Sequence, residues 1–225
     1  MKKYGNYECY IAQTPISDDK EMCIGACTKD TSKNIIMLIV VAKKGAETDC
    51  VQRFKGRTPK CYVSADTARK LQADEQAAVF MIFHELGHIV LGVSKRNKKD
   101  RNNKQHKISA LNQGIVDPDE LAADAFAAEY VGLEDSIKAL EESRDAYFLS
   151  FQHKILPDKT MPAKAYQEMS LRIEALKALE KIIKMNNKHK KRVHTALAFY
   201  VYYFLKIDSS HHLFKPTLYH ILPHI

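Results

Sequence analysis

The stretch "DEQAAVFMIFHELGHIVLG" at residues 74–92 predicts the central element of the fold. After its first three residues it is apolar on all sides, except for the two histidines and the glutamate of "HELGH" at residues 84–88. A helix that is apolar all round belongs inside a domain. Asp74 is a suitable N-cap and Gly92 a suitable C-terminal stop, so we expect a buried helix from Asp74 to about Leu91.

A second helix is predicted by "DPDELAADAFAAEYVG" at residues 117–132. Asp117 suits the N-cap, Pro118 the first helical position, and Glu120 lies three residues after the cap. Gly132 is a plausible stop. The many alanines make this helix thin, so that another helix can approach it closely.

The rest of the chain divides into an N-terminal part with strand signals and a longer helical part. Residues 34–45, "NIIMLIVVAKKG", form a continuous β-branched run that is typical of a buried strand. Weaker patterns predict strands at 6–14 and at 59–64, the latter at a sheet edge because it begins with a proline. Further helices are expected at 65–72, 134–151, 162–185 and 193–207. The predicted fold class is α+β, predominantly helical with a small N-terminal β-sheet.

The chain shows no internal repeat and no obvious linker, which favours a single domain over 1–225. We expect its core at about 30–150, a C-terminal helical extension at about 160–207 and a tail at 208–225. At this length a domain can bury a core without disulfide support.

Cysteine usage and hydropathy favour a cytoplasmic protein. The five cysteines are odd in number and follow no zinc-ribbon spacing, so we expect reduced thiols. In "CIGAC" at 23–27, two small residues in a loop or turn are favoured over a metal site or a disulfide. The N-terminus lacks the apolar stretch of a secretory signal. The longest apolar runs, 35–42 and 196–205, are shorter than the roughly 20 residues of a membrane span.

The formal net charge of +8 permits contact with anions. Much of it lies in "KRNKKDRNNKQHK" at 95–107, which has seven Lys or Arg against one Asp. No aromatic residue interleaves these charges, so an exposed loop is favoured over a nucleic-acid site. The histidines of the tail leave open a second metal site, with a disordered or partner-binding tail preferred; they are His211, His212, His220 and His224.

The spacing within "HELGH" indicates a metal site. Residues four apart share one face of a helix, so His84 and His88 can direct two imidazoles at one ion, with nitrogens about 2 Å from a zinc ion. Glu85 lies roughly 100° further round the helix, beside the ligands. Its carboxylate is therefore placed to take a proton from a zinc-activated water. We expect one bound Zn²⁺.

The third ligand is expected on the second helix. A longer motif with glycine at 91 and histidine at 94 is excluded, because Leu91 and Ser94 stand there. Glu120 is the best candidate. Asp124, one turn further on, can accept a hydrogen bond from the outer nitrogen of a ligand histidine.

Another interpretation makes Glu120 only part of a capping box with Asp117, and Asp124 an ordinary surface acid. It does not explain two acids on one face of an alanine-rich helix. Asp119 and Glu129 are the fallback candidates for the third ligand.

The segments "PKCYVSADTARKLQADEQAAVFMIFHELGHIVLG" and "DELAADAFAAEY" together resemble the gluzincins, zinc peptidases with two histidines from HExxH and a glutamate from a following helix. Within them the chain is similar to the catalytic domain of the CAAX-prenyl-protease and heat-shock-protease superfamily, with its ExxxD motif, and to ImmA/IrrE-type metallopeptidases. The resemblance covers roughly 59–132. The aspartate of ExxxD favours the first group.

The resemblance implies a zincin-like fold, with zinc ligands His84, His88 and Glu120. It also implies Glu85 as general base and Asp124 as the partner of a ligand histidine. The strand before the active-site helix would line the substrate cleft, and the free edge of "CYVS" would pair with an extended peptide.

The chain also departs from these families. The membrane helices of the prenyl proteases and a DNA-binding helix-turn-helix are absent, and Met161 stands where such peptidases carry a histidine before a proline. The donor that stabilises the oxyanion stays open: His153, Arg172 and His194 are candidates, each with a structural role preferred.

We therefore expect a zinc-dependent metallopeptidase that hydrolyses peptide bonds in a peptide or protein substrate. The alternative is a zinc regulatory protein of the same fold, either non-catalytic or cutting a single partner. An open fourth position on the zinc ion would favour the enzyme.

Overall fold

A computed structural model describes the chain over residues 2–4, 7–17, 19–29, 34–44, 50–52, 57–91, 116–152 and 160–186. Helices predominate over strands in these ranges, and the strands lie in the N-terminal part. The predicted α+β class, mostly helical with a small N-terminal sheet, is confirmed. The basic loop at 95–107, the helix expected at 193–207 and the tail lie outside the described residues.

One mixed sheet contains all the strands of the described part. The strands are β1 Lys2–Tyr4, β2 Tyr7–Ile11, β3 Met22–Lys29, β4 Ile35–Val41, β5 Cys50–Gln52 and β6 Lys60–Val63. They lie in the order β1-β2-β3-β4-β6-β5. Neighbouring strands run antiparallel except β4 and β6, which are parallel.

The expectation that "CIGAC" forms a loop or turn is wrong, because these residues lie within β3. The close approach of β2 explains why β3 has a glycine at position 25. A Cβ atom at this position would lie 2.3 Å from the carbonyl oxygen of Tyr10 in the neighbouring strand. Gly25 pairs with Ile11 of β2, and the register of β3 with β4 on its other side shifts between Cys23 and Gly25. Cys23 is exposed and Cys27 is buried, and both are free thiols.

The expectation that residues 59–64 form an edge strand is also wrong. β6 pairs with β4 on one side and with the short β5 on the other, where Val51 faces Cys61. Proline at 59 precedes the strand, so it removes no hydrogen bond from the ladder. The free edge expected along "CYVS" is therefore occupied by the chain itself.

The helices of the described part are α1 Ala65–Gln72, α2 Gln76–Val90, α5 Pro118–Val131, α6 Leu133–Gln152 and α7 Thr160–Asn186. The chain divides into two compact units, Met1–Ala178 and Leu179–Ile225, with the boundary inside α7. The single domain with a C-terminal extension stays a prediction. No helix within the described ranges combines the length and apolar character of a membrane span.

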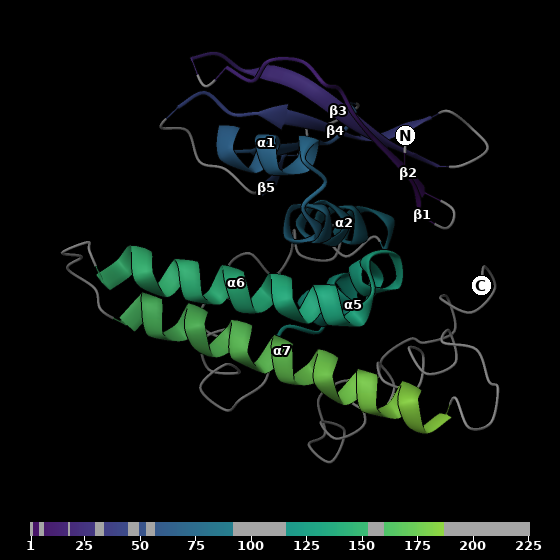
Figure 1. The fold of residues 1–225 in the computed structure, drawn as a ribbon, viewed down its shortest axis with the longest axis vertical. Helices are drawn as coiled ribbons and strands as arrows, with labels where there is room; N and C mark the ends of the chain where they lie inside the picture. The colour runs from purple at the N-terminus through teal and green to yellow at the C-terminus, as the bar shows by residue number, and fades with distance from the viewer. Residues whose placement is uncertain are drawn as a thin grey trace. The chain divides into compact units, whose positions relative to one another are not determined.

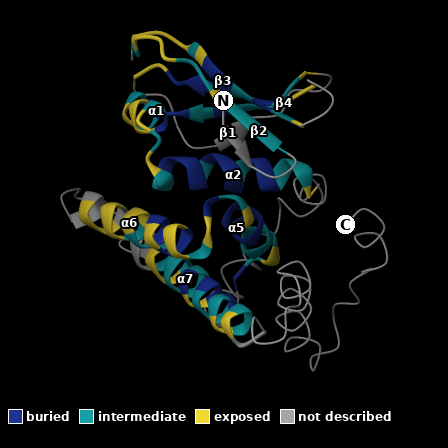
Figure 2. Ribbon diagram, turned by 45° about the vertical axis from the view of Figure 1, so that its right-hand side comes forward, coloured by how far each residue is buried: buried dark blue, intermediate teal, exposed yellow. Residues whose placement is uncertain are grey.

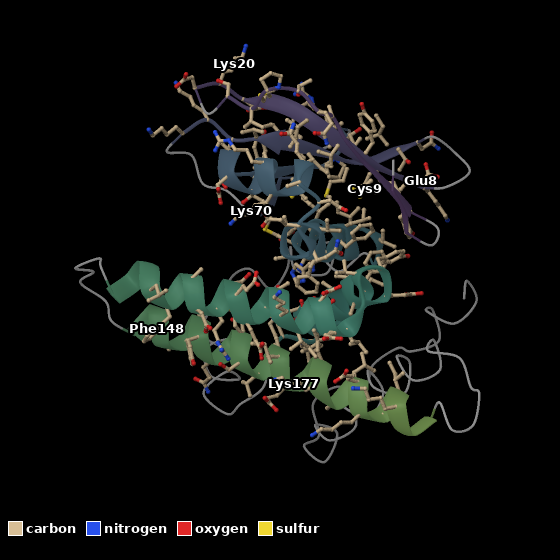
Figure 3. The ribbon with its side chains drawn as sticks, viewed as in Figure 1. Glu8, Cys9, Lys20, Lys70, Phe148 and Lys177 are labelled. Atoms are coloured by element: carbon tan, nitrogen blue, oxygen red, sulfur yellow. The ribbon has the colours of Figure 1, made fainter. Side chains whose placement is uncertain are left out.

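In the first unit α2 lies between the sheet and the helices α5 and α6 (Figure 1). Buried residues follow α2 along most of its length, as expected for a helix that is apolar all round (Figure 2). The sheet contributes buried apolar side chains to the core, including those of Met37, Ile39 and Val63. Cys9 lies on the side of the sheet that faces α2 (Figure 3).

The start of α2 differs from the expectation. Its N-cap is Glu75, which makes no capping hydrogen bond with its side chain, and Asp74 has a positive φ of 63°. α1 ends directly before this point, and the backbone N–H of Asp74 still donates to the carbonyl of Leu71. The tight reversal between two helices therefore takes Asp74 as its left-handed residue, a conformation that aspartate tolerates better than most.

Candidate metal centre

The helix α2 presents the two histidines to one point. His84 and His88 lie one turn apart, and their Nε2 atoms are 3.1 Å from each other. His84 is buried and His88 is partly buried. The i, i+4 spacing thus brings together the two nitrogens as the sequence predicted.

The helix α5 brings Glu120 to the same point. Its start is set by Asp117, whose side chain accepts a hydrogen bond from the backbone N–H of Asp119 at 3.1 Å. The Glu120 carboxylate oxygens lie 3.3 Å from His84 Nε2 and 3.6 Å from His88 Nε2. Asp117 therefore caps the helix through Asp119, while the Glu120 side chain lies beside the two histidines of α2.

A close contact between α2 and α5 makes this meeting possible. A Cβ atom on Gly87 would lie 3.2 Å from Cα of Ala123 and 3.3 Å from its carbonyl oxygen. Gly87 lies between the two histidines, and Ala123 lies between Glu120 and Asp124. Small residues at the crossing therefore set the separation of the helices to one that the site side chains can span.

The three side chains fit a metal ion. His84, His88 and Glu120 each offer one ligand atom, and these atoms lie within 4.8 Å of one another. Ligand atoms about 2.0–2.1 Å from a tetrahedral zinc ion lie roughly 3.3 Å apart. The separations of 3.1, 3.3 and 3.6 Å are close to this value. The described residues contain no other group of three such side chains, and neither Asp119 nor Glu129 joins this one.

Asp124 lies against the outer nitrogen of His84. Its Oδ1 accepts a hydrogen bond from His84 Nδ1 at 2.8 Å, and its side chain is 1% exposed. A proton on Nδ1 leaves the lone pair of Nε2 directed at the site. That lone pair faces a carboxylate and a second imidazole nitrogen, so the cluster requires a cation or a proton between them.

Arg172 from α7 completes the cluster, and the sequence did not predict this place for it. Its Nε donates to Asp124 Oδ2 at 2.7 Å, and its Nη2 to Asp124 Oδ1 at 2.6 Å. Nη1 lies 3.6 Å from Glu120 Oε2. The guanidinium thus binds Asp124 and lies beside the Glu120 carboxylate. The other candidate donors, His153 and His194, lie outside the described residues.

The electrostatics of the cluster follow from burial and pairing. Burial lowers the pKa of His84, but hydrogen bonds to Asp124 and Glu120 outweigh it and raise this pKa to about 9. Burial raises the pKa of Glu120, but hydrogen bonds from His84 and His88 bring it well below its usual value. Without a metal ion, a proton on His84 therefore fills the place of the cation at neutral pH.

Two further carboxylates contribute to the charge of the site. Burial raises the pKa of Asp124, but the charge of Arg172 outweighs it and lowers this pKa overall. Burial raises the pKa of Glu85. With neutral histidines, the carboxylates of Glu85, Glu120 and Asp124 and the Arg172 guanidinium leave a net charge of −2, which one divalent ion balances.

No protein-family model, no curated protein and no solved structure matches this chain.

Proposed function

We propose that the chain is a zinc-dependent metallopeptidase of the gluzincin type, with zinc held by His84, His88 and Glu120. Three protein ligands are the number found in catalytic zinc sites, which keep a fourth position for water or substrate. Structural zinc sites instead close the tetrahedron with four protein ligands. The three-ligand group supports the catalytic type.

The state of Glu85 is the observation that carries the proposal. Its carboxylate adjoins both histidines and is largely desolvated. Within the described part of the chain it has no hydrogen-bond or ion-pair partner, in contrast to Glu120 and Asp124. A partly buried acid without a structural partner is costly, so a functional role accounts for it better than packing does.

The chemistry follows from these positions. A zinc ion held by His84, His88 and Glu120 would lower the pKa of a water molecule and polarise a carbonyl group. Glu85 would then be placed to accept one proton of a water molecule whose oxygen attacks the carbonyl carbon. Its raised pKa then suits it to return the proton to the amide nitrogen as the C–N bond breaks.

The resemblance to gluzincins supports a peptide substrate. The short distances from His84 to Glu120 and to Asp124 support this resemblance. The geometry alone equally suits another amide. A non-catalytic zinc regulatory protein is the second candidate, favoured by the commitment of Arg172 to two carboxylates.

The test compares wild type with His84→Ala, Glu120→Ala and Glu85→Gln in zinc content and in hydrolysis of a mixed peptide library. We expect about one zinc ion per chain in wild type and Glu85→Gln, and strong loss of zinc in the other two variants. Hydrolysis should fall at least about 100-fold in Glu85→Gln, because general acid–base catalysis contributes about 10²–10⁴-fold.

The matched control is Glu75→Gln, which removes an exposed carboxylate at the start of the same helix. It should keep both zinc and activity. Equal hydrolysis by wild type and Glu85→Gln would refute the peptidase proposal. Full zinc affinity in Glu120→Ala would refute the third ligand.

A further inference from the structure

We propose that Arg172 is a positioning residue of the metal centre, which holds Asp124 and Glu120 so that the ligand atoms of His84 and Glu120 converge. The inference rests on the metal site of the proposed function and not on its peptidase activity. It assigns to α7 a part in a site that otherwise consists of α2 and α5.

The contacts of Arg172 are specific in geometry. Two of its nitrogens donate to the two oxygens of Asp124, at 2.7 and 2.6 Å, in a paired arrangement that fixes the plane of the carboxylate. The same Oδ1 accepts the Nδ1 hydrogen of His84. Arg172 therefore sets the orientation of the acid that in turn orients a ligand imidazole.

A second contact reaches a ligand directly. Arg172 Nη1 lies 3.6 Å from Glu120 Oε2, the oxygen that is 3.3 Å from His84 Nε2. One guanidinium thus touches both acids that α5 brings to the site. A lysine at this position would offer one point charge in place of a planar fork.

Stability alone does not explain this buried pair. The side chains of Arg172 and Asp124 are 12% and 1% exposed, so both charges lose most of their hydration. Well-packed apolar residues in place of such a pair often stabilise a protein equally or better. A role in the geometry of the site accounts for the charges at this position.

The charge of Arg172 makes the inference testable, because two effects on zinc affinity have opposite signs. As a cation beside the site, Arg172 repels a divalent ion, so removing its charge alone would tighten zinc binding. As a positioning residue it keeps the ligands in place, so removing it would weaken zinc binding. Loss of the outer partners of metal ligands typically weakens metal affinity about 10–100-fold.

The experiment measures the dissociation constant for zinc alone, by competition with a chromophoric chelator, and the visible absorption spectrum of the Co²⁺-substituted protein. The variants are Arg172→Met, Arg172→Lys and the control Lys177→Met. We expect about 10–100-fold weaker zinc binding in Arg172→Met, a smaller loss in Arg172→Lys, and altered Co²⁺ bands in both. Lys177 lies on the same helix and pairs with Glu141 near the surface, so its variant should match wild type (Figure 3).

A double variant separates positioning from general destabilisation. In an Asp124→Asn background, Arg172→Met should weaken zinc binding only a few-fold further, because its main partner is already changed. Where Arg172→Met does not fold by circular dichroism, Arg172→Lys, which keeps the charge, decides the question in its place.

Zinc binding equal to or tighter than wild type in the folded Arg172 variants, with an unchanged Co²⁺ spectrum, would overturn the inference and leave the metal site standing. Absence of zinc binding by wild type would overturn the metal site itself. Loss of zinc in Arg172→Met together with full hydrolysis by Glu85→Gln would support the inference and reject the peptidase.

Discussion

His84 makes contacts to both carboxylates that α5 contributes. Nδ1 bonds Asp124 and Nε2 faces Glu120, so each ring nitrogen has an acid beside it. In the metal-free protein this arrangement favours a doubly protonated imidazole, with a pKa of about 9. A metal ion bound by this group would compete with the proton for Nε2 of His84.

The stability of the metal-free protein should depend on this proton. His84 binds it more tightly in the folded chain than in the unfolded chain, where the pKa is about 6.5. The stabilisation is complete below pH 6.5 and is lost as the pH rises through 9. Urea unfolding with excess EDTA at pH 6, 7.5 and 9 should show a falling free energy of unfolding.

His84→Asn serves as the control, because it keeps a polar side chain but cannot titrate. Its free energy of unfolding should fall less over the same pH range. A wild-type value that rises from pH 6.5 to 9 while His84→Asn stays flat would contradict the assignment of the proton to His84.

For single residues, the sequence predicted which side chains share a helix face, but it did not predict the contact of Arg172 with Asp124. The i, i+4 spacings predicted that the histidines share a face, and that Glu120 and Asp124 do too. Arg172 lies 88 positions from His84, and no local pattern sets it apart from other cations of its helix. Only the packing of α7 brings it to the site.

The pair α2 and α5 forms the element on which the site depends. At their crossing, a Cβ atom on Gly87 would already lie 3.2 Å from Cα of Ala123, so a side chain larger than a methyl group would crowd the two helices. One helical turn before Gly87, Phe83 of α2 stacks on Tyr130 of α5 with ring centroids 4.9 Å apart. A larger side chain at Gly87 would push α2 and α5 apart, and this shift would also disturb the stacking of the aromatic rings.

Gly87→Val should lower the free energy of unfolding by about 1–3 kcal/mol through overpacking, and should weaken zinc binding because Glu120 moves away from the histidines. Gly87→Ala should stay within about 1 kcal/mol of wild type, since crowding offsets a gain of helix propensity. Urea unfolding and zinc competition measure the two quantities.

Ala77→Val places the same β-branched side chain in the same helix, away from the crossing, and should leave zinc affinity unchanged. If Gly87→Val binds zinc as tightly as Ala77→Val does, the close approach does not control the site.

The elements that were predicted well carry their own boundary signals. α5 begins and ends where Asp117, Pro118 and Gly132 place it, because caps act within a few residues. The small residues of β3 and the three residues of β5 have no such signal. They become strands because neighbours far along the chain pair with them, as Cys27 does with Cys9 and Met37.

For the molecule as a whole, a metal ion would join α2 to α5, and through Arg172 both would be tied to α7. An ion that binds only the folded chain stabilises it by mass action, by about 2.7 kcal/mol at 100 times the dissociation constant. For a chain of this size the melting temperature shifts by roughly 2–4 °C per kcal/mol. Chelation should therefore lower it by roughly 5–10 °C.

Differential scanning calorimetry with zinc and with EDTA measures this shift. Glu120→Ala should melt at nearly the same temperature in both conditions. An equal zinc-dependent shift in wild type and Glu120→Ala would mean that the stabilising ion binds elsewhere in the chain.

The partnership of Asp124 with Arg172 also sets an order of events during biosynthesis. The two residues are 48 positions apart, and a ribosome adds about 5–20 residues per second, so the arginine is made roughly 2–10 s after the aspartate. During that interval the nascent chain contains Asp124 but not yet Arg172, so this carboxylate lacks its arginine partner. We expect the group of His84, Glu120 and Asp124 to reach its final arrangement only once α7 has been translated.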